Sequence, residues 1–475
     1  MSRIRPSRVV VVGGGIAGLA SAHRLVELSR ERGSALELAL LEARERLGGT
    51  IATERSEGFL IEAGPDSFLS EKPWALALCQ RLGITDRLVG TDDRFRKTFV
   101  VHGGRLHPLP DGFQLLAPTR LMPLVVSPLF SCFGKLRMGL DLILPRGGSG
   151  DDESLGSFVR RRLGCEALER VAQPLVAGIY AGDPDQLSLA ATMPRFLEME
   201  QRHRSLILAL WKASRSAPEQ AKGASGARWS LFVTFAEGME ELVRVLSERL
   251  PHGSIRLKQE ALAVQRENGR WFVRLSDGGV IEADGVILAP PAYRSASVIR
   301  SADPALARLL EAIPYAPSAT VSLAYRRSDI PHPLDGFGFV VPRSEGRPIL
   351  ACTFSSVKYP GRAPEGFVLL RLFVGGALNE AALQEDDEAL VALCRAQLAE
   401  LLGVMAPPCL SRLHRFVAAM PQYQVRHLER VAAIERRLAE HPGLRLAGSA
   451  YRGVGIADCV RAGEEAAIWT LRDLG

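Results

Sequence analysis

The first 42 residues carry the pattern that most constrains how this chain can fold. Residues 8–12 form a short, largely β-branched run, which is typical of a buried parallel strand. The run leads directly into Gly13-Gly14-Gly15-Ile16-Ala17-Gly18, which has the spacing G-x-G-x-x-G. Residues 16–31 show apolar positions at helical spacing, and residues 36–41 predict a second strand that ends on Glu42. This order of elements predicts a Rossmann-type unit that binds a dinucleotide.

Each glycine of this loop has a separate task in such a unit. Gly13 allows a tight turn, Gly15 lets the backbone approach a pyrophosphate, and Gly18 lets the helix pack closely on the strand. Backbone N–H groups at the start of the helix, around Ile16 and Ala17, would bind the phosphates with the help of the helix dipole.

The composition fits a large globular protein and narrows the function classes. The 475 residues are 47% hydrophobic and 24% charged, which excludes disorder as the main state and leaves room for roughly two to three domain-sized units. The formal charge is +6, but the basic residues are spread out, which argues against a nucleic-acid binder and leaves room for a local cationic pocket. Seven scattered cysteines without C-x-x-C or metal-ligand spacing predict reduced thiols, no metal site and a cytoplasmic protein.

A second glycine pair follows the acid at the end of the second predicted strand. Glu42 would accept hydrogen bonds from the ribose hydroxyls of the dinucleotide. The residues after it complete the pattern E-x-x-x-x-x-G-G and include Ala43, Arg44, Gly48, Gly49 and Thr50. A plain nicotinamide-binding unit does not need this pair. The pattern resembles the FAD signature of the flavin amine oxidase superfamily, so we expect FAD as the cofactor.

A third glycine-rich element lies near the C-terminus. Residues 444–447 predict a strand, and the loop and helix start that follow include Gly448, Tyr451, Gly453, Val454, Gly455 and Ile456. Such a loop places backbone N–H groups where they can contact the ribityl chain and the flavin ring. Covalent amine oxidases attach the flavin to a cysteine of this loop, and this loop contains none. We therefore expect noncovalent FAD.

Further segments carry a closer resemblance. They are residues 59–68 (FLIEAGPDSF), 178–188 (GIYAGDPDQLS), 235–242 (FAEGMEEL), 336–342 (GFGFVVP), 373–376 (FVGG) and 451–455 (YRGVG). Together they resemble the oxygen-dependent protoporphyrinogen/coproporphyrinogen oxidases of haem synthesis, and the resemblance covers essentially the whole chain. The Y-A-G-D-P-x-x-L-S stretch is the most specific, because generic amine oxidases lack it.

The resemblance implies a flavin-side loop and substrate contacts. The loop that would lie beside the flavin ring comprises Gly64, Pro65, Asp66 and Ser67. Asp66 is the nearest candidate acid or base, with a structural hydrogen-bonding role as the alternative. The implied substrate residues are Val340 and Phe373 against a pyrrole ring, the backbone near Gly178 facing the macrocycle N–H groups, and Thr353, where many members carry an apolar residue. Without its motif, Phe373 would be better interpreted as an ordinary strand-core aromatic residue.

One departure from the family concerns the substrate's propionates. Many members place an arginine six residues before Gly104, where this chain has Thr98, preceded by Arg94, Arg96 and Lys97. Our hypothesis is that Arg96 or Lys97 binds a propionate instead, and the alternative is a solvated loop. Protoporphyrinogen IX has two propionates and coproporphyrinogen III has four, and the cationic cluster tilts the expectation slightly towards coproporphyrinogen III.

The predicted fold is α/β, with units that are interleaved in sequence. Residues 1–90, 228–296 and 410–475 are assigned to a split, Rossmann-type FAD-binding domain, within which residues 271–288 predict a β-meander that returns to a parallel strand. Residues 91–110, 205–227 and 297–409 are assigned to a substrate-binding domain with a mixed sheet. Residues 111–204 are assigned to a helical region, and its apolar, proline-broken run 121–130 is either groove-lining or a peripheral membrane contact.

The resemblance implies FAD-dependent oxidation of an anionic tetrapyrrole, a porphyrinogen, by dioxygen with release of hydrogen peroxide. We expect a cytoplasmic enzyme, with contact at the inner face of the plasma membrane as an option, because no signal peptide and no run of about 18 apolar residues is present. Two alternatives stay open. One is a flavin amine oxidase or carotenoid desaturase-like oxidoreductase, and the other is a prenyl-protein escort of the GDP-dissociation-inhibitor type, which has lost flavin.

Overall fold

The N-terminal strand β1 (Ser7–Val12) lies at the centre of a five-stranded parallel sheet. The computed structural model describes residues 6–110, 113–114, 117–118, 121–147, 152–216 and 231–474. The sheet order is β12 (Ile255–Leu257), β2 (Leu36–Glu42), β1, β16 (Gly285–Leu288) and β22 (Leu444–Leu446). Distant parts of the chain thus complete one Rossmann-type sheet, and the predicted α/β fold is confirmed.

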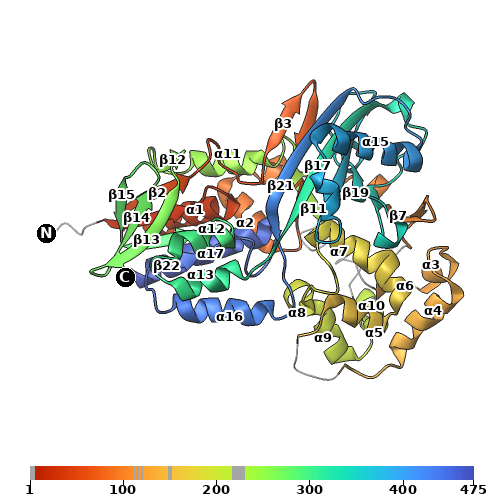
Figure 1. The fold of residues 1–475 in the computed structure, drawn as a ribbon, viewed down its shortest axis with the longest axis horizontal. Coiled ribbons are helices and arrows are strands. Elements are labelled where there is room, and N and C mark those ends of the chain that lie inside the picture. The colour runs from red at the N-terminus through yellow and green to blue at the C-terminus, as the bar shows by residue number, and fades with distance from the viewer. Residues whose placement is uncertain are drawn as a thin grey trace.

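Both faces of this sheet are covered, which explains the continuous run of valines in β1. Val9 and Val11 pack under the helices of one face, which are α1 (Ile16–Glu31), α2 (Pro73–Leu82), α11 (Glu240–Glu248) and α17 (Ile456–Asp473). Val10 and Val12 contact the other face, where α12 (Ala292–Ile299), α13 (Pro304–Glu311), α16 (His427–Leu438) and a three-stranded sheet lie (Figure 1).

That three-stranded sheet is the predicted β-meander. It consists of β13 (Ala261–Glu267), β14 (Arg270–Leu275) and β15 (Val280–Ala283), all antiparallel. β15 then leads into β16, which pairs in parallel with β1, so this prediction is confirmed.

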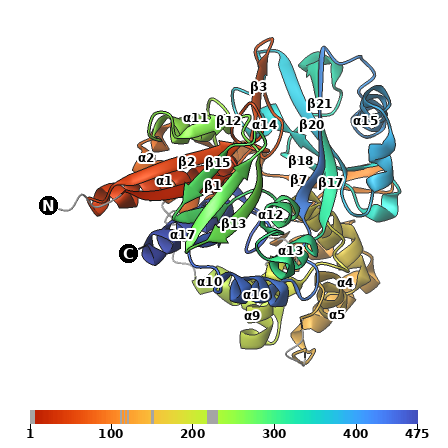
Figure 2. The same cartoon turned by 60° about the vertical axis from the view of Figure 1, so that its left-hand side comes forward.

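A seven-stranded mixed sheet forms the second layer of the molecule. Its order is β21 (Leu410–Pro421), β17 (Tyr315–Arg326), β20 (Phe367–Gly375), β19 (Ile349–Phe354), β18 (Gly338–Val340), β7 (Thr98–His102) and β8 (Arg105–Pro108). Only β18 and β7 pair in parallel. One face packs on α15 (Asp387–Leu402), and the other faces the helical region. Figure 2 shows α15 on the outer side of this sheet.

The helical region lies below the mixed sheet in both views (Figures 1 and 2). It contains α3 (Leu121–Val126), α4 (Cys132–Gly139), α5 (Leu155–Arg162), α6 (Cys165–Ala167), a π-helical turn (Leu168–Ala172), α7 (Gln173–Tyr180), α8 (Leu189–Thr192), α9 (Pro194–His203) and α10 (Leu206–Ser216). Among the residues that the structure describes, no helix is long and apolar enough to cross a membrane.

Short elements join these layers. They are the hairpin β3 (Thr53–Ser56) and β4 (Phe59–Glu62), the small sheet of β5 (Phe68–Leu69), β11 (Phe232–Phe235) and β6 (Leu88–Gly90), the pair β9 (Phe113–Gln114) and β10 (Ala117–Pro118), and α14 (Ser355–Lys358).

Some elements lie outside the units to which their residues were assigned. β21 is the edge strand of the mixed sheet, although residues 410–475 were assigned to the FAD-binding domain. α10 packs in the core of the helical region, although residues 205–227 were assigned to the substrate-binding domain, and residues 217–227 lie outside the described residues. α13 packs on the Rossmann-type sheet. Long-range pairing, which no local pattern encodes, decides these positions.

Candidate active site

The glycine loop after β1 forms an open cradle at the start of α1. Gly13 has φ +97°, and a Cβ on Gly18 would lie 1.9 Å from the carbonyl oxygen of Gly13. A Cβ on Gly15 would meet nothing within 4 Å, so the backbone there faces open space. Gly15 precedes the first residue of α1, and no side chain caps that helix. Since the first N–H groups of a helix lack partners within it, this geometry fits a phosphate-bearing group.

The second glycine pair lies directly on this cradle. Gly48 donates a backbone hydrogen bond to the carbonyl oxygen of Gly14 at 2.8 Å, and Gly48 and Gly15 form a parallel β-bridge. A Cβ on Gly49 would lie 3.4 Å from Cα of Gly15. The two glycine motifs of the sequence therefore form one surface.

Glu42 lies at the edge of the cradle and is nearly buried, at 8% exposure. Its carboxylate accepts hydrogen bonds from the backbone N–H groups of Gly14 at 2.7 Å and Arg44 at 2.9 Å. A carboxylate has about four acceptor positions, so ribose hydroxyls could still bind to it.

The C-terminal glycine loop is strongly constrained. Gly448 and Gly453 have φ +125° and +144°, which side-chain-bearing residues rarely adopt. A Cβ on Gly453 would lie 2.3 Å from Cγ of Asp458. After Val454, Gly455 caps α17, which begins at Ile456.

The helices α1 and α17 cross closely and run in the same sense. A Cβ on Gly463 would lie 2.3 Å from the carbonyl oxygen of Ala17, and Arg32, at the end of α1, donates to the carbonyl oxygen of Leu471, near the end of α17. Both helix N-termini, at Ile16 and Ile456, therefore face the same end of the Rossmann-type unit.

The loop that contains Gly64 and Asp66 connects the cradle to the mixed sheet. A Cβ on Gly64 would lie 1.9 Å from the carbonyl oxygen of Thr50, which follows the second glycine pair. From the mixed sheet, Thr320 donates to the carbonyl oxygen of Ala63 at 2.9 Å. Arg371 donates to the same oxygen at 2.9 Å and to that of Gly64.

Asp66 is held as a carboxylate. Burial would raise its pKa, but the positive charges of Lys358 and Arg371 and the hydrogen bond from Ser67 outweigh burial and lower the pKa to about 2. Lys358 lies 3.1 Å from one carboxylate oxygen, and the Ser67 hydroxyl donates to the other at 2.7 Å. Because Asp66 is ionised at neutral pH, its structural role is favoured over that of an acid.

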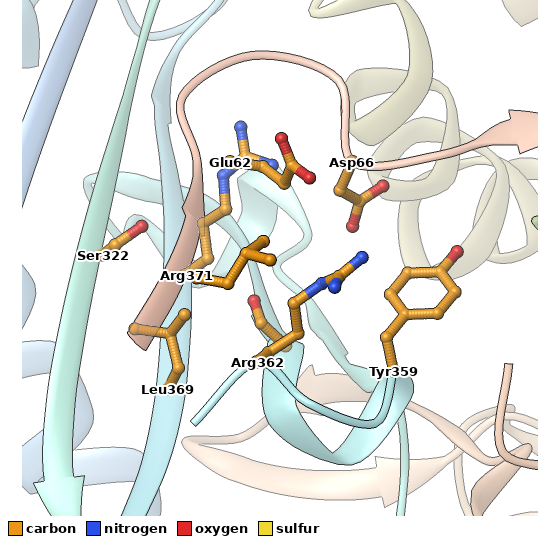
Figure 3. Close-up of a pocket in the computed structure, with 9 residues that line it drawn as sticks. Glu62, Asp66, Ser322, Tyr359, Arg362, Leu369 and Arg371 are labelled. Atoms are coloured by element: carbon orange, nitrogen blue, oxygen red, sulfur yellow. The ribbon is translucent and has the colours of Figure 1, made fainter. Parts of the chain in front are cut away.

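Glu62, Arg362 and Arg371 gather behind this loop around a cavity with room for about one water molecule (Figure 3). Burial raises the pKa of Glu62 to about 7, although the backbone N–H of Met239 and the hydroxyl of Thr53 donate to its carboxylate. No pattern in the sequence predicted a role for these residues or for Lys358. A signal was present for Arg371, since an arginine interrupts the apolar run of residues 367–374.

The substrate residues predicted by resemblance lie together on the mixed sheet. Phe373 pairs with Ala351, and Ala351 pairs with Val340, so all three share the face that packs against the helical region. Thr353 is two residues from Ala351 and therefore shares that face. α7 packs against β18 and β19, and a Cβ on its Gly178 would meet nothing within 4 Å.

Arg96 and Lys97 each pair with an acidic side chain. Arg96 pairs with Asp93 at 2.8 Å, and both side chains are exposed. Lys97 pairs with Asp335 at 2.7 Å. Phe99, two residues further, packs in the core under α15, so alternation places Lys97 on the face opposite to Phe373.

Comparisons with known proteins agree with this architecture. Residues 16–468 match the family described as flavin containing amine oxidoreductase. The chain is 36% identical to coproporphyrinogen III oxidase of Bacillus subtilis over 96% of both chains, and 33% identical to protoporphyrinogen oxidase of Bos taurus over 97% of both. A crystal structure of a candidate protoporphyrinogen oxidase from Exiguobacterium sp. 255-15 superposes with a TM-score of 0.85 at 33% identity and covers 99% of both chains. This chain belongs to the family of flavin-containing amine oxidoreductases.

Proposed function

We propose that this chain is an oxygen-dependent porphyrinogen oxidase of haem biosynthesis. It would convert coproporphyrinogen III, and to a lesser extent protoporphyrinogen IX, to the porphyrin and release hydrogen peroxide. The observation that carries the proposal is the sheet face of Val340, Thr353 and Phe373, which lies opposite α7 and adjoins the Gly64–Asp66 loop. Relatives that cover nearly the whole chain bear the corresponding names.

We propose noncovalent FAD as the flavin. The cradle of Gly13–Gly18 and Gly48–Gly49 fits a pyrophosphate, and Glu42 fits a ribose. Cys459 is the cysteine nearest to the C-terminal loop, and it lies buried on α17. The chemistry that a flavin supplies is the acceptance of hydride from carbon and the transfer of electrons to dioxygen.

The side chains on the sheet face of Val340, Thr353 and Phe373 would bind and orient the substrate. Phe373 offers an aromatic face to a flat macrocycle, and Val340 offers an apolar one. Arg371, whose guanidinium lies 4.9 Å from the centre of the Phe373 ring, ties that strand to the Gly64 carbonyl. Sheet and loop would therefore keep a fixed relative position. We assign no side chain as a general base.

The deciding experiment is turnover of the two porphyrinogens by the purified protein, followed by porphyrin fluorescence and peroxide formation. We expect turnover in air, none without oxygen, and a higher kcat/KM for coproporphyrinogen III. Failure to oxidise either porphyrinogen, with turnover of an amine, would favour the amine oxidase alternative. Protein that binds no flavin would favour the escort alternative.

We further propose a peripheral lipid contact through α3, α4 and the turn after α4. The exposed apolar side chains there are Met122, Val125, Val126, Phe133, Leu136 and Ile143, with exposures between 57% and 85%. Lys135 donates to the carbonyl oxygen of Val125 at 2.6 Å and so joins the two helices. Leu124 and Phe130 of the same segment pack in the core that contains Val340. An apolar substrate surface and an apolar outer surface thus share one segment.

Vesicle flotation tests this contact. We expect Phe133→Ser with Val126→Ser to reduce binding to vesicles that contain anionic lipid at least about fivefold, because both side chains would leave the lipid. The control is Met405→Ser with Val417→Ser, which changes two side chains that are 81% and 84% exposed elsewhere. Equal flotation of both double variants would contradict a contact through α3 and α4.

A further inference from the structure

The linker Gln422–Arg426, between β21 and α16, lies where three parts of the molecule meet, and its first two residues are buried. Gln422 is 5% exposed and Tyr423 1%, and His427, the first residue of α16, is fully buried. Figure 1 shows β21 passing α7 and α8 on its way to α16. None of these residues belongs to the cofactor cradle or to the substrate face described above.

On one side, the linker pairs with the segment that follows α7. Ser188 donates its backbone N–H to the carbonyl oxygen of Tyr423 at 2.7 Å, and Val425 donates to that of Gln186 at 2.9 Å. Leu187 and Gln424 form an antiparallel β-bridge between these bonds. The partner of the linker is therefore the Y-A-G-D-P-x-x-L-S stretch, residues 180–188.

A glycine of that stretch makes close contact with the linker. Gln422 donates its side-chain amide to the carbonyl oxygen of Tyr180 at 2.9 Å. A Cβ on Gly182 would lie 2.5 Å from Oε1 of Gln422, so a larger residue there would displace this side chain. This close contact explains on steric grounds why the motif has a glycine at position 182.

On the other side, the linker holds the C-terminal glycine loop. The Tyr423 hydroxyl donates to the carbonyl oxygen of Ser449 at 2.5 Å and accepts from the backbone N–H of Gly453 at 2.8 Å. One hydroxyl therefore satisfies two backbone groups on either side of the loop. Its removal would leave both without that partner, which is costly for buried groups.

His427 supports the same arrangement. Its ring stacks on the ring of Tyr423 with centroids 4.0 Å apart and planes 13° apart. Its Nε2 lies 2.8 Å from the carbonyl oxygen of Tyr451, and because a carbonyl can only accept, Nε2 carries the proton. Three positions of the glycine loop, at 449, 451 and 453, are thus held by two stacked side chains.

We propose that Tyr423 is a positioning residue that holds the C-terminal glycine loop in its flavin-binding shape and ties it to the segment after α7. The inference rests on the proposed function, which assigns this loop to the flavin. It goes further by linking the flavin loop to the helix that carries Gly178, through residues outside the glycine cradle and the substrate face.

The first test is Tyr423→Phe, which keeps the ring and its stacking on His427 and removes only the hydroxyl. We expect the Kd for FAD, from titration of the apoprotein, to rise at least about tenfold, and the visible circular dichroism of bound flavin to change. The matched control is Tyr325→Phe, an equally buried tyrosine in the core of the mixed sheet. Far-UV circular dichroism confirms that each variant is folded.

The second test asks whether the contact between the linker and the segment after α7 affects flavin binding, apart from the hydrogen bonds of Tyr423 to the C-terminal glycine loop. Gly182→Ala lies outside the cradle, and we expect it to raise the Kd for FAD at least about threefold by displacing Gln422. Gly139→Ala is its control, because a Cβ there meets nothing within 4 Å. An unchanged Kd in Tyr423→Phe overturns the positioning role, and an unchanged Kd in Gly182→Ala overturns the link. Wild-type protein that binds no FAD would instead overturn the proposed function.

Discussion

The ammonium group of Lys358 lies 3.1 Å from the carboxylate of Asp66, and the two residues are 292 positions apart in sequence. Lys358 is the last residue of α14, which follows β19 of the mixed sheet, and Asp66 lies in the loop whose Gly64 contacts Thr50, next to the second glycine pair. This pair connects the mixed sheet to the Rossmann-type unit. The contribution of this ion pair to the free energy of unfolding can be measured directly.

We expect Asp66→Asn to lower the free energy of unfolding by about 1–3 kcal/mol, because Lys358 and Arg371 lose their common counter-charge. Since the lowered pKa of Asp66 keeps it ionised, its contribution to stability is present above its unfolded pKa and is lost as the pH falls towards 2. The pH dependence of the turnover rate of Asp66→Asn between pH 5 and 9 should keep the inflection points of the wild type. Urea unfolding and pH-rate profiles test both points, with Asp93→Asn as the exposed control.

Glu62 should have the opposite pH dependence. Its pKa of about 7 in the fold means that it binds a proton more tightly than in the unfolded chain, so it lowers stability progressively as the pH rises from about 4.5 to 7. Glu62→Gln should remove about 2–3 kcal/mol of this loss between pH 4.5 and pH 8. Unfolding experiments at pH 4.5 and pH 8 measure this change in the free energy of unfolding. The exposed control Glu198→Gln should keep the wild-type pH dependence, and a Glu62→Gln variant that also keeps it would contradict the expectation.

Gly18→Ala should abolish flavin binding. The new Cβ would lie 1.9 Å from the carbonyl oxygen of Gly13, so the loop or the helix must move. We expect the Kd for FAD to rise at least about a hundredfold and the purified variant to be colourless. Gly139→Ala, which adds a methyl group in open space, should bind FAD normally. A yellow Gly18→Ala protein with wild-type Kd would exclude this loop as the cradle.

Phe373→Leu should raise KM for the porphyrinogen about tenfold and leave the Kd for FAD unchanged, because the aromatic surface of the substrate face is lost. Phe339→Leu is the matched control, since Phe339 lies on β18 of the same sheet but packs in the core under α15. Steady-state kinetics by porphyrin fluorescence decides the matter. Equal KM values in the two variants would mean that Phe373 is an ordinary core residue.

Arg96→Ala and Lys97→Ala should each leave KM for coproporphyrinogen III within about twofold of wild type. Both cations pair with exposed or half-exposed acids, and Lys97 lies on the face away from Phe373. This expectation departs from the hypothesis drawn from the sequence. A KM increased about fivefold or more in either variant would restore the cationic loop as the propionate site.

Local patterns were enough to predict the parts of the glycine cradle. The glycines at 13, 15 and 18, the acid at 42 and the meander of residues 271–288 follow from steric demands and from strand and helix periodicity, which act over a few residues. The resemblance added Val340 and Phe373, and the strand register places them on one face.

Other features could not be predicted from single positions. Nothing in the sequence around Tyr423 indicates that its hydroxyl binds the loop of Ser449 and Gly453, because that contact depends on how β21 and α16 are placed. The adjacency of Arg96 and Lys97 to Thr98 suggested a substrate contact, but it could not indicate that Asp93 and Asp335 pair with these cations.

Short stretches of the chain specify where the backbone must lack a side chain and where strands must be apolar, since a missing Cβ and the periodicity of burial are local properties. The three-dimensional packing alone specifies which charges and hydroxyls meet, as Lys358 does with Asp66 and Tyr423 with Gly453. Such pairs form between segments that the packing of separate layers brings together, and their energies depend on burial and register that no short stretch of chain specifies.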